Sequence, residues 1–166
     1  MKRLILVSCL FAVILMPRVS NAVDFVSETK NWEYALSLGY KMHTQEDVED
    51  AFAAGFRAQR RVAYPLLAGI GAEASYFQNI IYCEINVPVT YRIGLGPIKA
   101  DAMVIPGGAY AYNFDNKNDK LMGTLSTGLE IKKFIQKGKS IGLGVFYTMC
   151  TYNELNNFRV SFVFGF

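Results

Sequence analysis

Charged side chains recur at alternating positions of this sequence, each among small or polar neighbours. Successive side chains of an extended strand point to opposite faces, so this spacing places the charges on one face. Five of the residues are acidic and seven are basic, and the chemistry that such a set supports is ion pairing. We predict a buried ion-pair network of Glu33, Lys41, Arg57, Glu73, Glu84, Arg92, Asp101, Glu130, Lys132 and Arg159, with Arg61 and Lys99 on the same face.

The sequence contains none of the common motifs of catalysis or cofactor binding. It lacks a metal-ligand cluster, a glycine-rich phosphate loop and a nucleophile elbow. The glycines of residues 69–71 and 142–144 face the same way as the charges, and we interpret them as relieving crowding there. We therefore predict a protein without a cofactor, metal site or catalytic residues.

Eight segments of alternating polarity must position these charges. The Ala-rich second segment would also suit a helix, but its regular spacing of polar residues favours a strand. Proline cannot donate to a strand ladder, so Pro88 predicts a bulge, and residues 106–108 predict a second interruption. The predicted strands are residues 32–43, 51–61, 66–77, 81–93, 98–113, 121–133, 140–152 and 158–166.

The second face of every strand is apolar, which leaves three all-β architectures open. They are a soluble sandwich, a lipocalin-like cup and a transmembrane barrel. Small residues mixed with both signs of charge suit a narrow barrel interior, and aromatic residues near strand ends suit the two membrane interfaces. These aromatic residues are Tyr34, Tyr40, Tyr76, Tyr91, Tyr110, Tyr112, Phe158 and Phe166. We predict an eight-stranded antiparallel up-and-down transmembrane β-barrel.

The amino terminus has the features of a cleavable secretory signal peptide. Lys2 and Arg3 precede an apolar run over residues 4–16, and small residues precede a cleavage site after Ala22. A lipoprotein signal ending at Cys9 is the alternative, although the apolar run would then follow the cysteine. We predict a signal peptide at 1–22 and one barrel domain at 23–166. The predicted mature chain has 14 bases and 14 acids, because three of the 17 bases and none of the 14 acids leave with the signal. This balance gives no reason to expect nucleic acid or anionic lipid as a partner.

The last strand ends on a row of aromatic side chains. Phe158, Phe162, Phe164 and Phe166 share one face, and this strand resembles the carboxy-terminal assembly signal of bacterial outer-membrane proteins. Together with the signal peptide and the eight strands, it gives the whole mature chain a resemblance to the small OmpA/OmpX-type outer-membrane barrels. The resemblance implies an integral outer-membrane protein of a Gram-negative bacterium. Its implied partners are outer-membrane lipids, the barrel-assembly machinery and periplasmic chaperones, with a monomeric state and no nucleic acid.

This resemblance implies location more strongly than activity, and three functions stay open. The leading one is a non-enzymatic role in envelope structure or surface interaction. The alternatives are a narrow, porin-like pore for small solutes and a lipid A-modifying enzyme. The enzyme reading has little support, because the only histidine, His43, lacks the His-x-Ser pattern of a deacylase, and residues 23–31 are too short for a palmitoyltransferase-like helix. Cys83 is predicted to point outward and Cys150 inward on strands that are not neighbours, so we expect two free thiols.

Overall fold

Each alternating segment forms β-strand in the computed structural model, which describes residues 32–45, 47–95, 98–136 and 138–166. The Ala-rich segment is a strand and not a helix, as its polar spacing predicts. The elements are β1 Trp32–His43, β2 Ala51–Ala63, β3 Leu66–Phe77, β4 Ile80–Asn86, β5 Val89–Leu95, β6 Ile98–Asn113, β7 Asn118–Gln136, β8 Lys139–Cys150, the 3-10 helix η1 Asn153–Leu155 and β9 Asn157–Gly165.

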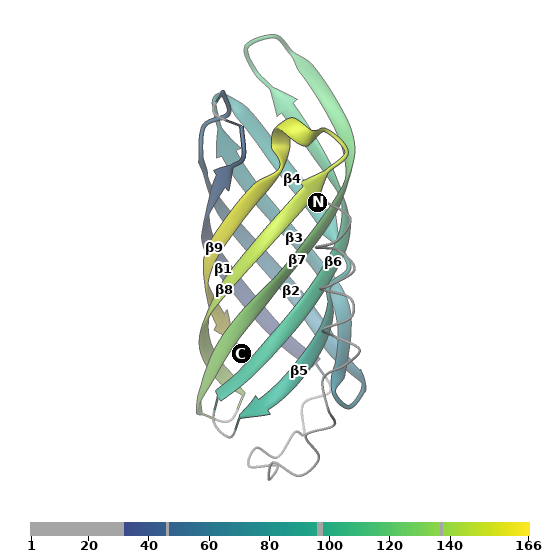
Figure 1. Ribbon diagram of the computed structural model, residues 1–166, viewed down its shortest axis with the longest axis vertical. Helices are drawn as coiled ribbons and strands as arrows, with labels where there is room; N and C mark the ends of the chain where they lie inside the picture. The colour runs from purple at the N-terminus through teal and green to yellow at the C-terminus, as the bar shows by residue number, and fades with distance from the viewer. Residues whose placement is uncertain (1–31, 46, 96–97, 137) are drawn as a thin grey trace, which may run out of the picture.

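The strands close into an antiparallel barrel, so the sheet has no lateral edge left open along its length (Figure 1). The first strand β1 pairs with β2 on one side and with the last strand β9 on the other. Strands β4 and β5 lie end to end between β3 and β6. The register against β3 is the same for both strands, and so is the register against β6. The two strands therefore occupy one strand position, and the barrel has the eight positions predicted from the sequence.

The two irregularities predicted at Pro88 and at residues 106–108 do not occur. Strand pairing stops briefly at Pro88, but the register with β3 and β6 is the same before and after it, so no extra residue forms a bulge. The Pro88 carbonyl still accepts a 3.1 Å hydrogen bond from the Gly69 amide, so the ladder resumes without a shift. Strand β6 runs through Pro106 without a break, and the register shifts lie instead near Val62 and Ile135.

The barrel has two dissimilar ends. The loop end carries the connections 44–50, 78–79, 114–117 and 151–156, and the hairpin of β6 and β7 rises above the rest of it (Figure 1). The terminal end carries the first described residue, Trp32, the carboxy-terminal Phe166 and the short turn after β2. The backbones of Tyr34 and Phe166 exchange two hydrogen bonds there, of 3.3 Å and 3.0 Å.

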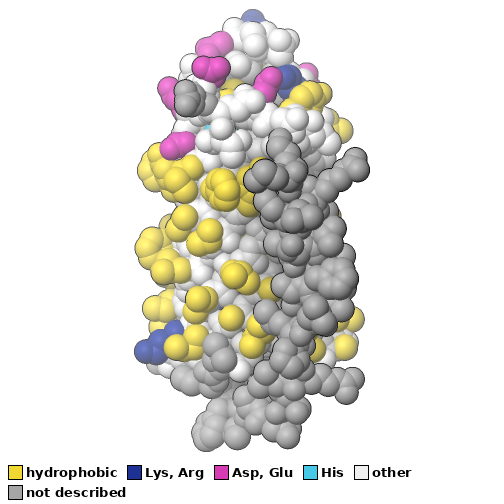
Figure 2. Space-filling view, in the orientation of Figure 1, with side chains coloured by type: hydrophobic (Ala, Val, Ile, Leu, Met, Phe, Trp, Pro, Cys, Tyr) yellow, Lys and Arg dark blue, Asp and Glu magenta, His cyan; other side chains and the backbone are white. Residues whose placement is uncertain are grey.

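The two faces of the strands are arranged as predicted. Large apolar side chains of alternate positions are exposed on the outside, including Leu129 at 59% and Phe162 at 63%, and they form an apolar belt around the barrel. Figure 2 shows this belt between a loop end with acidic and a few basic side chains and an opposite end with basic side chains. Cys83 is exposed, Cys150 is buried, and both thiols are free.

Among the described residues, no helix is long and apolar enough to cross a membrane. The predicted signal peptide, its cleavage site at Ala22 and the polar segment after it lie outside the described residues, so the domain boundaries stay predictions.

Candidate functional site in the barrel interior

The ten charged residues of the predicted network all lie on the inward face of the strands. Glu33, Arg57 and Arg159 are partly exposed, and the other seven are buried. Burying an unpaired charge is costly, so the position of each partner decides whether the interior is stable. The structure divides the residues into two groups at different depths, one nearer the terminal end and one nearer the loop end.

The group nearer the terminal end centres on Asp101 and Arg92. Arg92 donates two hydrogen bonds to the Asp101 carboxylate, at 2.7 Å and 2.9 Å. It also donates two to Glu33, at 2.5 Å and 2.8 Å. Bidentate contacts between guanidinium and carboxylate are the strong form of this bond, so Arg92 is held on both sides.

Lys132 and Glu130 of β7 connect this group to Arg57 on the opposite wall of the barrel. The Lys132 ammonium lies 3.0 Å from Asp101 and 2.9 Å from Glu130, and Glu130 in turn lies 2.5 Å from a guanidinium nitrogen of Arg57. Neither acid has any exposed side-chain surface. We call these six residues the Asp101 network. It contains three acids and three bases, so its charges balance: Glu33, Asp101, Glu130, Arg57, Arg92 and Lys132.

The group nearer the loop end centres on one carboxylate. Glu73 binds Lys41 at 2.6 Å through one oxygen and Arg159 through the other. Both cations also lie over aromatic rings: the Lys41 ammonium is 4.3 Å from the centre of the Tyr82 ring, and the Arg159 guanidinium is 4.6 Å from that of Phe146. We call Lys41, Glu73 and Arg159 the Glu73 cluster.

Glu84 is the one predicted network member that makes no ion pair within the described interior. Its carboxylate accepts hydrogen bonds from the Tyr82 hydroxyl at 3.1 Å and from the Asn86 amide at 3.0 Å. It therefore lies beside the Glu73 cluster and is linked to it through Tyr82, whose ring faces Lys41.

Residues of like charge face one another at several positions of the sheet, whereas Arg92 faces its partner Asp101 directly in the β5–β6 pair. Lys41 is directly opposite Arg159 in the β1–β9 pair, and Glu73 is opposite Glu84 in the β3–β4 pair. Asp101 likewise faces Glu130. Like charges directly opposite one another on paired strands are destabilising. The ion pairs of Glu73 with Lys41 and Arg159, of Glu130 with Arg57 and of Glu33 with Arg92 join strands that are not neighbours, so these charges act as internal cross-links.

Phe146 was not singled out in the sequence, although its inward position was predicted. The side chain is 1% exposed and packs with Met103 and Ile105. A Cβ added to Gly128 or Gly144 would lie 2.5 Å from its ring. The predicted role of Gly144 in relieving crowding is confirmed, because its missing side chain leaves room for the aromatic platform under Arg159.

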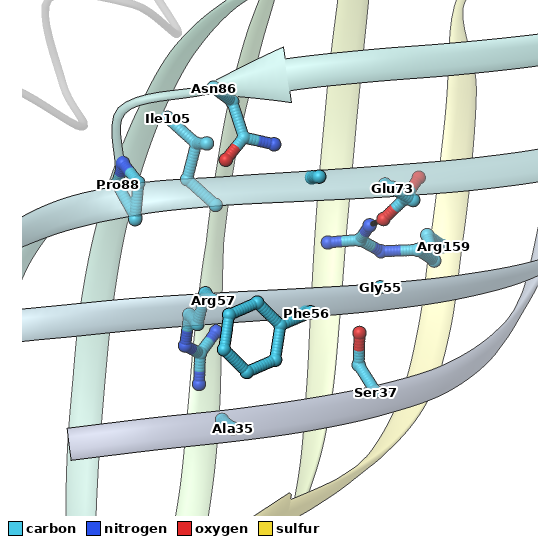
Figure 3. Close-up of a pocket in the computed structure, with 11 residues that line it drawn as sticks. Ala35, Ser37, Gly55, Phe56, Arg57, Glu73, Asn86, Pro88, Ile105 and Arg159 are labelled. Carbon is cyan, nitrogen blue, oxygen red and sulfur yellow. Dashed lines mark ion pairs between the residues drawn. The ribbon is translucent and has the colours of Figure 1, made fainter.

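A small cavity separates the two charged groups (Figure 3). It has a volume of about 30 Å³ and is lined by Arg57 of the Asp101 network and by Glu73 and Arg159 of the Glu73 cluster. The Nε atoms of both arginines are buried without a protein partner. A cavity of this size and polarity has room for about one or two water molecules, which suits these donors.

The loop end of the interior is filled by apolar side chains. These side chains form an apolar cluster, and Val48 and Leu155 of the connecting segments pack onto it together with Ile80. The apolar cluster and the two charged groups therefore occupy successive levels of the lumen. Its buried members are Ala51, Phe77, Tyr82, Ala109, Ala111, Met122 and Cys150.

The other candidate groups have structural partners. The His43 ring nitrogen Nδ1 lies 2.7 Å from the Glu49 carbonyl, and the ring packs 4.7 Å from that of Phe77. The Ser75 hydroxyl accepts a 3.4 Å hydrogen bond from Lys41. No group of three or more histidine, cysteine or acidic residues suited to a metal ion occurs in the described part of the chain.

Comparison with known proteins bears on the fold. No protein-family model and no curated protein matches the chain. The crystal structure of Neisserial surface protein A superimposes with a TM-score of 0.68 over 82% of this chain and 96% of that one, at 9% identity. This chain has the fold of the small eight-stranded outer-membrane barrels. The predicted resemblance is thus confirmed for the architecture. Ail, the attachment invasion locus protein of Yersinia pestis, gives a TM-score of 0.49 at 9% identity, with 82% and 100% of the two chains covered.

Proposed function

We propose that the chain is an integral protein of the bacterial outer membrane, with its loop end outside the cell and its terminal end in the periplasm. The apolar belt around the closed barrel is the observation that carries this proposal. A soluble barrel would direct that face inward, whereas here the interior holds the ions. Lipid contact on every side is the environment in which such a surface is stable.

Within the membrane, the protein is non-enzymatic and serves envelope structure or interaction at the cell surface. The filled interior supports this role over that of a pore: the Asp101 network, Phe146 and the apolar cluster succeed one another along the lumen. The contacts of His43 with the Glu49 carbonyl and Phe77 fit a structural residue at the loop end. Side chains that are already paired are poorly placed to act on a lipid or a solute.

Biogenesis follows from the same assignment. Export by the signal peptide would end with cleavage after Ala22, and periplasmic chaperones would pass the chain to the barrel-assembly machinery. The outward phenylalanines of β9, Phe158, Phe162 and Phe164, together with Phe166, provide an exposed aromatic row for recognition before closure against β1. Closure needs no second copy of the chain, and the barrel functions as a monomer in the lipid bilayer.

Membrane fractionation combined with heat-modifiable gel mobility tests the location. We expect the protein in the outer-membrane fraction, migrating faster before boiling than after it. Recovery as a soluble periplasmic protein would refute the proposal. A matched variant, Phe166→Ser, tests the assembly signal, and we expect less folded protein from the same amount of exported chain.

Two measurements separate the alternative functions. In planar bilayers we expect no stable openings, and openings that change when Glu73 or Arg92 is neutralised would establish a pore instead. Mass spectrometry of lipid A from cells with and without the protein should give identical acyl patterns. An altered pattern that disappears in His43→Ala would assign enzymatic activity.

A further inference from the structure

Exposed charges are divided unequally between the two ends of the barrel. Among the described residues, the exposed bases at the terminal end are Arg60, Lys133 and Lys139, and no exposed acid accompanies them. The near-equal totals over the whole sequence conceal this separation. The loop end carries six exposed acids and two exposed bases: Asp47, Glu49, Asp50, Asp115, Asp119, Glu154, Lys117 and Lys120.

The three bases at the terminal end face outward, at the margin of the apolar belt. Lys133 continues the outward row of Leu129 and Ile131 on β7 and pairs with Ile141 of β8. Lys139 lies two residues before Ile141 on the same face. Lys133 and Lys139 therefore lie within the last part of the outward apolar row, where Ile98 and Ile141 are beside Lys133 and the exposed Ile135 follows it.

Arg60 has a comparable outward position on β2, on the opposite side of the barrel from β7, and the exposed Val62 follows it. Arg60 follows Phe56 and Ala58 on the outward face and lies directly opposite Trp32 in the β1–β2 pair. Trp32 is exposed, and tryptophan favours the boundary between hydrocarbon and headgroups. An outward arginine beside an interfacial tryptophan is placed at the depth of the lipid phosphates.

We propose that Arg60, Lys133 and Lys139 bind the phosphate groups of anionic phospholipids in the inner leaflet of the outer membrane. The proposal rests on the outer-membrane location and orientation proposed above. Long basic side chains can cover apolar surface with their stems and reach the headgroups with their charges. Each base near a membrane surface raises affinity for an anionic lipid by roughly fivefold. A phosphatidylglycerol headgroup keeps a net negative charge beside these bases, whereas phosphatidylcholine is neutral overall.

Spin-labelled lipids in vesicles of phosphatidylcholine measure this selectivity directly. We expect the folded protein to hold spin-labelled phosphatidylglycerol in its motionally restricted shell about fivefold or more over spin-labelled phosphatidylcholine. The preference should fall close to equality in the triple variant Arg60→Gln, Lys133→Gln, Lys139→Gln. The variant with Arg60→Lys should keep it, because the charge is unchanged.

The matched control is the double variant Lys117→Gln, Lys120→Gln, which removes exposed bases from the loop end and should keep the preference. Raising the salt concentration should weaken the preference of the unaltered protein, since exposed charges are screened. Equal retention of both lipids by the folded protein, or an unchanged preference in the triple variant, would overturn the inference alone. Failure of the protein to acquire heat-modifiable mobility in any vesicle would instead refute the proposed location, and the inference with it.

Discussion

The two charged groups of the interior neutralise their ions in different ways. In the Asp101 network every carboxylate meets a cation, and Arg92 binds two acids with both edges of its guanidinium. In the Glu73 cluster two cations share one carboxylate and lie over aromatic rings. The first group relies mainly on ionic hydrogen bonds, and the second combines them with the negative faces of π-systems.

This difference follows from the cross-sections that each group occupies. Gly128 and Gly144 leave the space that the Phe146 ring fills, and the ring then lies under Arg159. At the level of Asp101 no such ring is present among the described contacts, and charged side chains from five strands fill the lumen. Stability should therefore depend most on charge balance near the terminal end, and on both charge and packing near the loop end.

The largest expected effect comes from removing the charge of Asp101. Asp101→Asn keeps the shape of the side chain but leaves Arg92 and Lys132 without their shared anion. We expect a loss of about 3–5 kcal/mol in the free energy of unfolding, because a buried ion loses its partner. Guanidinium unfolding in lipid vesicles measures it. Asp119→Asn at the exposed end of β7 is the control, with an expected change within about 0.5 kcal/mol. Equal losses in the two variants would contradict the central role of Asp101.

A smaller loss is expected from Glu73→Gln. Lys41 and Arg159 then lose their common carboxylate, but the rings of Tyr82 and Phe146 still face them. We expect a loss of about 2–3 kcal/mol, because a desolvated cation–π contact retains up to about 2 kcal/mol of the stabilisation. The same unfolding assay compares it with Asp101→Asn. A loss greater than that of Asp101→Asn would show that the rings do not compensate for the missing anion.

Replacing the aromatic platform itself should cost less again. Phe146→Leu keeps an apolar side chain between Gly128 and Gly144 but removes the ring under Arg159. We expect a loss of about 1–1.5 kcal/mol, the usual range for a conservative change of a packed apolar side chain. Leu129→Val on the outward, exposed face of β7 provides the comparison, with a smaller change expected. An unchanged stability of Phe146→Leu would rule out any contribution of the ring to holding Arg159.

The strands and their faces could be predicted from the sequence because both depend on a period of two residues. The bounds of β1, β3 and β6 coincide with the predicted segments. The predicted bulge at Pro88 is wrong for a physical reason. The sequence shows that a proline has no amide hydrogen to donate, but the register of the strand at Pro88 is set by its pairing with β3 and β6. A local signal such as a proline does not contain that information.

The pairing of charges across the lumen was beyond prediction for a related reason. The alternation of the sequence predicts that Arg57 and Glu130 point into the barrel, but not that they lie at the same depth. The two residues are on opposite sides of the barrel, on β2 and β7. Their meeting depends on the stagger between all the strands that separate them. Among the neighbours that register does predict, Lys41 and Arg159 carry the same charge. Arg92 and Asp101 carry opposite charges, so register accounts for only part of the pairing.

The smallest expected effect is the coupling free energy between the Asp101 network and the Glu73 cluster, which tests whether the two groups are independent. Among the described residues, no ion pair joins them across the cavity between Arg57 and Arg159. Combining Asp101→Asn with Glu73→Gln should therefore change the free energy of unfolding additively. Groups without a shared partner usually add within about 0.5 kcal/mol. A double-mutant cycle in the same vesicles measures the deviation. As a control within one group, Asp101→Asn with Lys132→Met should deviate by more than this, because the two side chains are 3.0 Å apart. A comparable deviation in both cycles would mean that water or movement of the arginines couples the groups into one network spanning the lumen.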